Sequence, residues 1–186
     1  MLIRFIGSPG SGKTTVAAKV FAHLKETSWA CDFVTEYARH HIAKIKFYHP
    51  QNPVLLTDED QCEIMSQQNL LDRVFSESCG PNCIIITDTC PLNALFYMSK
   101  EYRSEALVKI ETKRCTDKPS LYFYSPPIKE LSVSDPNRVH SKEISMEVDK
   151  QIPQILAEFA PEIKVHPLVG TADQRMTQVL TQIYGM

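Results

Sequence analysis

A glycine-rich stretch near the start of the chain, GSPGSGKTT, has the residue types and the spacing of a phosphate-binding loop. Gly7, Gly12, Lys13 and Thr14 fit the pattern G-x-x-x-x-G-K-[ST]. In such a loop successive backbone N–H groups face a phosphate, the lysine reaches the outer phosphates, and the threonine hydroxyl can ligate Mg²⁺. The residues expected to hold a nucleotide here are Gly7, Ser8, Pro9, Gly10, Ser11, Gly12, Lys13, Thr14 and Thr15.

An aspartate follows an apolar run in the segment CIIITD, residues 83–88. The continuous apolar residues 84–86 are typical of a buried strand in a parallel sheet. A carboxylate at the end of such a strand is the usual partner of a phosphate-binding loop, where it holds Mg²⁺ directly or through water. We therefore expect Asp88 and Thr14 to bind the metal, with Asp88 as a mere helix cap as the alternative.

A second acidic residue, Glu36, ends another apolar run in the segment VTEYAR. We hypothesise that Glu36 orients an acceptor hydroxyl and takes its proton during phosphoryl transfer, with Asp88 as the alternative base. Arg39 lies one helical turn further on, where it can bind a substrate phosphate or fix Glu36. An equally good interpretation of Glu36 and Arg39 is an ion pair on a solvated helix start, which contributes little stability.

The elements that position these residues are strands and helices in regular alternation. This alternation predicts an α/β fold with a parallel sheet and helices on both of its faces. Thr57 with Asp60, and Thr171 with Gln174, fit the capping signals of two of the helices. The predicted strands cover 2–7, 30–36, 83–88, 120–125 and 163–169, and the predicted helices 13–25, 37–46, 58–78, 143–160 and 172–184.

Composition sets limits on the class of protein. The chain has 186 residues, 43% of them hydrophobic, which suits one globular domain with a substantial core. The net charge of −2 argues against a nucleic-acid partner, though it leaves one open. No apolar run approaches the ~18 residues of a membrane span, and the N-terminus lacks a signal-peptide pattern, so we expect a cytoplasmic protein. We accordingly expect its cysteines, including Cys79 and Cys83, to be free structural thiols.

The phosphate-binding loop alone does not distinguish a kinase from a GTPase or a motor. A guanine-specific switch protein should show D-x-x-G after the third strand, whereas here Asp88 is followed by TCP. A motor ATPase would need a second domain or a helical lid, for which the length leaves little room. These absences favour a small kinase.

Several segments together resemble one known family. The pieces FIGSPGSGKTT, VTEYARHHI, TDTCPLNALFY, LYFYSPPI…DPNR and VGTADQRMTQVLTQI occur in the same order as in the ribosylnicotinamide kinase domain of NadR-type NAD-salvage enzymes. These enzymes form a compact group of P-loop kinases, also described as NadR-like AAA domains, and the resemblance covers nearly the whole chain. It implies a nucleoside-type acceptor, with nicotinamide riboside as the first candidate, and ATP with Mg²⁺ as the phosphoryl source.

The resemblance also implies an architecture. It predicts a single P-loop kinase domain over 1–186, a parallel sheet in the order 2-3-1-4-5, and a short lid at about 125–142. Arg138 of this lid can close over the phosphates, with an ordinary surface arginine as the alternative. In that order Asp88 lies beside the phosphate-binding loop, and Glu36 one strand further out, about 10 Å from the first strand. By analogy with related kinases, Gly170, Thr171 and Ala172 are expected to cradle adenine.

The acceptor should be recognised near Glu36. Tyr37 and Arg39 of the same motif, Asp88, and Gln68 on the helix 58–78 are the expected contacts, since amide groups and aromatic rings suit a nucleoside. Two other functions remain as alternatives: a deoxynucleotide or nucleic-acid hydroxyl kinase, and a non-catalytic ATP- or GTP-binding regulator. The presence of Glu36 favours catalysis, because a protein that only binds a nucleotide has no use for it. The sequence leaves open whether the protein is a monomer or a homo-oligomer.

Overall fold

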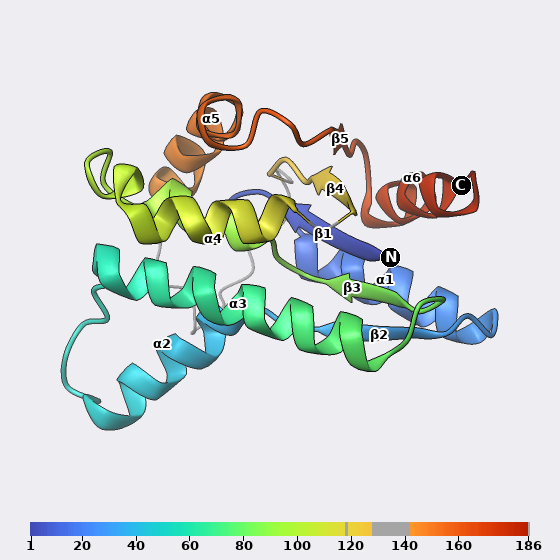
Figure 1. Ribbon diagram of the computed structural model, residues 1–186, viewed down its shortest axis with the longest axis horizontal. Coiled ribbons are helices and arrows are strands. Elements are labelled where there is room, and N and C mark those ends of the chain that lie inside the picture. Colours follow the sequence, from blue (N-terminus) through green and yellow to red (C-terminus); the bar gives the residue numbers. More distant parts are fainter. Residues whose placement is uncertain (118, 128–141, 186) are drawn as a thin grey trace.

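A computed structural model describes residues 1–117, 119–127 and 142–185 of the chain (Figure 1). Five parallel strands form one sheet in the order β2-β3-β1-β4-β5, which confirms the predicted order. Every residue of β1 and β3 is buried, and this explains why the apolar run 84–86 is continuous rather than alternating. The strands are β1 (Leu2–Ile6), β2 (Cys31–Val34), β3 (Ile84–Thr87), β4 (Ser120–Tyr124) and β5 (Val165–Pro167).

Helices cover both faces of the sheet, as the alternation predicted. Apolar residues of α1 and α6 pack with Ile3 and Phe5 on one face, while those of α3, α4 and α5 pack on the other face, in part with Ile6 and Tyr122. None of the described helices is both long and apolar enough to cross a bilayer. The helices are α1 (Lys13–Glu26), α2 (Tyr37–Tyr48), α3 (Asp58–Ser78), α4 (Ala106–Thr116), α5 (Lys142–Phe159) and α6 (Ala172–Tyr184).

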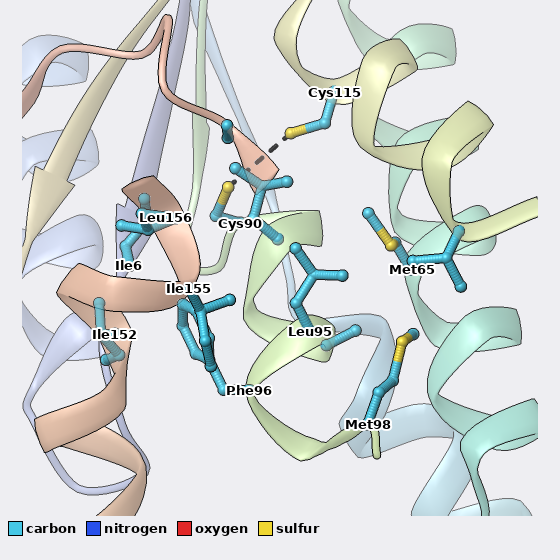
Figure 2. Close-up of a cluster of buried hydrophobic side chains, with 14 of the residues drawn as sticks. Ile6, Met65, Cys90, Leu95, Phe96, Met98, Cys115, Ile152, Ile155 and Leu156 are labelled. Atoms are coloured by element: carbon cyan, nitrogen blue, oxygen red, sulfur yellow. Dashed lines mark hydrogen bonds between the residues drawn. The ribbon is translucent and has the colours of Figure 1, made fainter. Parts of the chain in front are cut away.

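Two 3₁₀ helices, η1 (Pro91–Tyr97) and η2 (Tyr102–Ser104), connect β3 to α4, and neither they nor α4 had been delimited from the sequence. Figure 2 shows how η1 fills the space between α3 and α5: Leu95 and Phe96 lie in one buried cluster with Met65 and Ile152. Since η1 directly follows the segment that carries Asp88, this packing fixes the wall beside that carboxylate.

Both predicted helix caps are present. The Thr57 side chain accepts a hydrogen bond from the Asp60 N–H, and the Asp60 side chain accepts one from the Thr57 N–H. Thr171 and Gln174 form the same reciprocal capping box at the start of α6. These caps fix where α3 and α6 begin, because they satisfy backbone donors that the helix leaves unpaired.

A buried ion pair links the centre of the sheet to α3. Arg4 in β1 is 1% exposed, and its Nη2 lies 3.0 Å from Oδ2 of Asp72. The same guanidinium donates to the carbonyl oxygen of Cys115 and to the hydroxyl of Tyr122. Arg4 therefore links α3 and the end of α4 to the middle of the sheet. The apolar run in which it lies gives no indication of this role.

The cysteines differ from expectation at one place. Cys79 and Cys83 form a disulfide, so the prediction of free thiols at these two positions is wrong. The turn between α3 and β3, with Gly80 at a positive φ of 92°, brings the two Cα atoms to 5.6 Å, a separation that suits a disulfide. Cys31, Cys62, Cys90 and Cys115 are free, as predicted, and all four are buried. The thiols of Cys90 and Cys115 are 3.9 Å apart (Figure 2).

Candidate active site

The candidate site lies where β1, β2 and β3 end. β1 leads into the phosphate-binding loop, β2 into Glu36 and β3 into Asp88. Thr87 is in register with both Arg4 and Val34, and the Asp88 N–H donates to the Val34 carbonyl, so the three strand ends lie side by side. This edge, at the carboxyl ends of parallel strands, is where α/β folds bind ligands.

The phosphate-binding loop depends on its glycines. Gly10 and Gly12 have φ near 80°, in the left-handed region that glycine tolerates best. A Cβ on Gly7 would lie 2.4 Å from the backbone oxygen of Ser125, so no larger residue fits there without a shift of backbone. The loop ends at Gly12, directly before α1, so the positive end of this helix faces the place expected for the phosphates.

The two residues that complete the loop motif are both engaged. The Lys13 ammonium donates to the carbonyl oxygens of Gly7 and Ser8, at 2.8 and 2.9 Å, and so spans the loop. The Thr14 hydroxyl donates to Oδ2 of Asp88 at 2.9 Å. The threonine and the aspartate that the sequence paired as metal ligands are therefore in direct contact.

This pair of oxygen groups has the chemistry that Mg²⁺ requires. Asp88 is 2% exposed, and its Oδ1 has no hydrogen-bond partner among the described residues. A buried carboxylate oxygen without a partner is costly unless a donor or a cation completes it. A carboxylate and a hydroxyl are hard oxygen ligands of the kind that bind Mg²⁺ together with water and phosphate, so the residues present fit the metal.

Burial and a neighbouring charge change the acidity of Asp88. Burial, followed by the negative charge of Glu36, raises its pKa to about 6, although Thr14, Lys13 and Arg39 act in the opposite direction. The two carboxylates therefore interact across the site. A cation bound to Asp88 would act against this rise in pKa, because a nearby positive charge favours the ionised carboxylate.

Glu36 occupies the N-cap position of α2, and Arg39 follows it by one turn. Nε of Arg39 lies 3.3 Å from Oε2 of Glu36, and the two side chains are 45% and 28% exposed. The predicted ion pair thus exists, and its exposure means that it adds little stability by itself. Both residues are close enough to affect the pKa of Asp88, so both predicted roles of Arg39 stay predictions, as a phosphate ligand or as a support for Glu36.

Gln68 holds the start of α2. Its Oε1 accepts the backbone N–H of Tyr37 at 2.8 Å, while its Nε2 donates to Asp72 at 3.1 Å and to Thr87 at 3.4 Å. Because both ends of the amide are already bonded, we assign Gln68 to positioning Glu36 beside the site, and its predicted contact with a substrate stays a prediction. The ring of Tyr37 lies against His40 and His41, on the side of α2 toward α3, and is not part of the pocket wall.

A pocket of about 320 Å³, its open mouth included, adjoins Glu36. Its wall contains one carboxylate, that of Glu36, and neither Lys nor Arg occurs among the described residues that line it. Sequence reasoning missed Asn93 and Tyr97, which reach the pocket from η1, because a 3₁₀ segment shows no amphipathic period. The lining residues are Glu36, Ala38, Gln61, Ile64, Gln68, Thr89, Cys90, Pro91, Asn93, Ala94 and Tyr97.

The segments expected to surround the nucleotide are described in part. Gly170 has a positive φ of 86° and, with Thr171 and Ala172, forms the turn between β5 and α6. Residues 125–127 begin the predicted lid, whereas Arg138 and the rest of that lid up to 141 lie outside the described residues. The sequence did not single out Asp149 of α5, whose carboxylate accepts hydrogen bonds from the hydroxyls of Tyr124 and Ser8.

Comparison with known proteins agrees with this fold. A model of the AAA domain matches residues 2–175. The chain belongs to the AAA domain family. No curated protein matches the sequence. The family and the five-stranded sheet together establish a P-loop nucleotide-binding fold.

Solved structures support the same fold. A NadR protein in complex with NAD and AMP-PNP matches with a TM-score of 0.69 at 21% identity, over all of this chain and 49% of that one. A NadR protein in complex with NR matches with a TM-score of 0.72 at 21% identity, over all of this chain and 52% of that one. A third structure, APE1195, matches with a TM-score of 0.52 at 14% identity and is covered to 95%.

The chain thus spans about half the length of the NadR proteins that it matches. Identities near 20% establish a shared fold, and the resemblance to NadR-type kinases is confirmed at that level.

Proposed function

We propose that the protein is an ATP- and Mg²⁺-dependent kinase that transfers the γ-phosphoryl group to a hydroxyl of a nucleoside-type acceptor. The observation that carries this proposal is the position of Glu36, which lines a pocket and is close enough to Asp88 to raise the pKa of that carboxyl. A protein that only binds a nucleotide needs Lys13, Thr14 and Asp88 but has no use for a carboxylate in a neighbouring pocket.

Each side chain has a definite task in this mechanism. Lys13 and the N–H groups of the loop bind the phosphates, and Asp88 with Thr14 would hold Mg²⁺, which neutralises charge on the triphosphate. Glu36 accepts a hydrogen bond from the acceptor hydroxyl, orients its oxygen toward the γ-phosphorus, and takes the proton as the P–O bond forms. ADP leaves with the electron pair of the broken bond.

The supporting groups complete the proposal. Arg39 stays paired with Glu36 or turns to the γ-phosphate, and Arg138 of the lid segment 125–142 closes over the phosphates. Gly170, Thr171 and Ala172 hold the adenine, while Tyr37 and Gln68 support the acceptor side. These roles are proposals drawn from the motif and the family resemblance.

The pocket favours an acceptor without a phosphate group. Its described wall has no basic side chain, and Arg39, outside that wall, is paired with Glu36, whereas a nucleotide or nucleic-acid acceptor would need cations for its phosphates. Nicotinamide riboside is our first candidate, because solved NadR proteins of the same fold bind NR and AMP-PNP. We expect the reaction to occur in the cytoplasm, where ATP is available.

The decisive experiment measures ADP formation from MgATP with a panel of acceptors. The panel contains nicotinamide riboside, the common nucleosides, nucleoside monophosphates and an oligonucleotide with a free 5′-hydroxyl. We expect stimulation by one or more nucleosides, and mass spectrometry should show a product heavier by one phosphate. Stimulation only by the monophosphates or the oligonucleotide would replace the proposed acceptor class, and binding of ATP with no stimulation by any acceptor would favour a regulator.

A further inference from the structure

Arg175, which the sequence analysis did not single out, is buried at the point where three segments meet. It lies in the first turns of α6, is 3% exposed, and directs its guanidinium away from solvent. Its Nε donates to the carbonyl of Gly170, and its Nη1 donates to the carbonyl of Ser11, the hydroxyl of Ser125 and the carbonyl of Pro126. All four distances are between 2.8 and 3.0 Å.

These acceptors belong to the three segments that should surround a bound nucleotide. Gly170 is in the turn between β5 and α6, Ser11 is in the phosphate-binding loop, and Ser125 and Pro126 follow β4 at the root of the predicted lid. Ser125 strengthens the junction, because its hydroxyl also donates to the Ser11 carbonyl at 2.8 Å and its backbone oxygen abuts Gly7. The planar guanidinium of Arg175 therefore holds these three segments in place relative to one another.

The Ser11 carbonyl receives two hydrogen bonds on one side of the loop, from Arg175 and Ser125. A carbonyl held in this way orients the peptide that it shares with the N–H of Gly12, at the start of α1. Loops of this kind bind phosphate through their N–H groups. The hydrogen bonds to the Ser11 carbonyl therefore orient the loop for an anion, although Arg175 itself does not contact that anion.

The charge of Arg175 adds to this effect. No carboxylate lies within ion-pair distance of its guanidinium in the part of the chain that the structure describes, and its acceptors there are carbonyl and hydroxyl oxygens. Buried charges are normally paired with an opposite charge. An unbalanced cation immediately behind a phosphate-binding loop raises the electrostatic potential where a polyanion should bind.

We propose that Arg175 is a positioning residue for the nucleotide: it locks the phosphate-binding loop to the adenine-side turn and the lid root, and its charge strengthens polyphosphate binding from behind the loop. The inference rests on the proposed function only for the identity of the ligand, a nucleoside triphosphate with Mg²⁺. It requires neither a particular acceptor nor turnover.

The test compares Arg175→Met, which removes both the charge and the guanidinium hydrogen bonds, with Arg175→Lys, which keeps the charge but loses the guanidinium geometry. Affinities for MgATP and for inorganic tripolyphosphate are measured by calorimetry at two salt concentrations, without an acceptor. We expect Arg175→Met to weaken both ligands by about tenfold or more, because hydrogen bonds from a charged donor to the loop are lost. Unchanged affinities for both ligands in both variants would overturn the proposal.

The salt dependence separates this role from simple packing of α6. Arg175→Met should bind tripolyphosphate with a shallower dependence on salt than wild type, because one cation is missing from the site, whereas Arg175→Lys should keep the wild-type slope. An unchanged slope in Arg175→Met would refute the electrostatic part. Thermal unfolding shows whether Arg175→Met folds, and if it does not, the test is made with Arg175→Lys. We then expect Arg175→Lys to bind both ligands more weakly than wild type but with the same dependence on salt. Wild-type affinity in Arg175→Lys would refute the proposal.

A matched control is available on the same pair of helices. Lys19 of α1 forms an exposed ion pair with Asp173 of α6 at 2.7 Å, away from the loop. Lys19→Met should leave both affinities unchanged, and a loss equal to that of Arg175→Met would refute a specific role for Arg175. Failure of the kinase proposal can be distinguished from failure of the inference about Arg175. If the wild-type chain binds MgATP but phosphorylates no acceptor, the kinase proposal fails and the role of Arg175 in nucleotide binding is unaffected.

Discussion

At the scale of single residues, the site is defined by two carboxylates with different surroundings. Asp88 is buried and bonded to Thr14, while Glu36 is partly exposed and paired with Arg39. Since burial and Glu36 both raise the pKa of Asp88, the protonation of one carboxylate depends on the charge of the other. This difference in surroundings favours Asp88 as the metal ligand and Glu36 as the base.

The role of Glu36 predicts a large effect of a small change. Glu36→Gln keeps the size of the side chain but cannot take a proton, so turnover should fall by about 100-fold or more. MgATP affinity, measured by calorimetry, should stay near wild type, because Glu36 lies on the acceptor side. Glu26→Gln, at the exposed end of α1, serves as the control. Near-normal turnover in Glu36→Gln would exclude Glu36 as the base.

The pKa of Asp88 predicts a dependence of stability on pH. Because folding raises this pKa from 3.8 to about 6, the folded chain binds the proton more tightly than the unfolded chain. The contribution of Asp88 to the free energy of unfolding is therefore fully present below about pH 4 and is lost as the pH rises through about 6. Asp88→Asn should raise the free energy of unfolding by about 1–3 kcal/mol at pH 7.5 without Mg²⁺.

Urea unfolding at pH 4 and pH 7.5 measures this difference. At about pH 4 the variant and the wild type should be nearly equal in stability, since Asp88 is then largely protonated. An equal effect of Asp88→Asn at both pH values would contradict the raised pKa. In the same variant, Mg²⁺-dependent turnover should be lost.

The sequence predicted this site unevenly, for physical reasons. Lys13, Thr14 and Asp88 were identified because their chemistry requires a fixed spacing or a fixed place at a strand end. Asn93 and Tyr97 were missed because a 3₁₀ segment leaves no periodic pattern. Arg175 was missed because its role depends on carbonyl groups from three distant segments, which no local pattern encodes.

At the scale of elements, the start of α2 is set by α3 rather than by its own sequence. Glu36 occupies the N-cap position but makes no side-chain cap, and the Tyr37 N–H is instead bonded to Gln68. The orientation of the proposed base therefore depends on a glutamine on a neighbouring helix. The sequence identified α2 and α3 separately, but the contact between them is tertiary and could not be predicted from either.

Gln68→Leu tests this dependence. The variant leaves the Tyr37 N–H without its acceptor, which costs about 1–3 kcal/mol and should displace the start of α2. We expect the KM for the acceptor to rise by about tenfold, while the affinity for MgATP, measured separately, stays near wild type. Gln67→Leu, one residue earlier on α3 and outside the pocket wall, should change neither quantity. An unaltered acceptor KM in Gln68→Leu would show that α2 is held by other contacts.

At the scale of the whole molecule, a buried ion pair joins the sheet to one helical layer. Alternation and continuous apolar runs were enough to predict the parallel sheet, its helices and, with the family resemblance, its strand order. They were not enough to predict the buried ion pair of Arg4, because a single arginine in an apolar strand gives no indication of its partner. Its partner Asp72 lies 68 residues away and also accepts a hydrogen bond from Gln68.

Removing the carboxylate should destabilise the whole fold. Asp72→Leu leaves the Arg4 guanidinium buried without its counter-charge, so the free energy of unfolding should fall by about 3–5 kcal/mol. Glu77→Gln, which breaks the exposed pair of Arg73 and Glu77 on the same helix, should cost no more than about 1 kcal/mol. Denaturant unfolding of the two variants gives the comparison. A similar loss of unfolding free energy in both variants would mean that the buried ion pair stabilises the fold no more than the exposed one.

The central place of β1 also matters while the chain is being synthesised. β1 leaves the ribosome before the other strands of the sheet, yet its neighbours begin only at Ile84 and Ser120, and β2, which is made next, does not pair with it. At translation rates of about 5–20 residues per second, β1 waits about 4–16 s for its first neighbour. During that interval a strand that is apolar except for Arg4 is uncovered on the nascent chain, so the yield of native protein should depend on the rate of elongation and on chaperones that shield this segment.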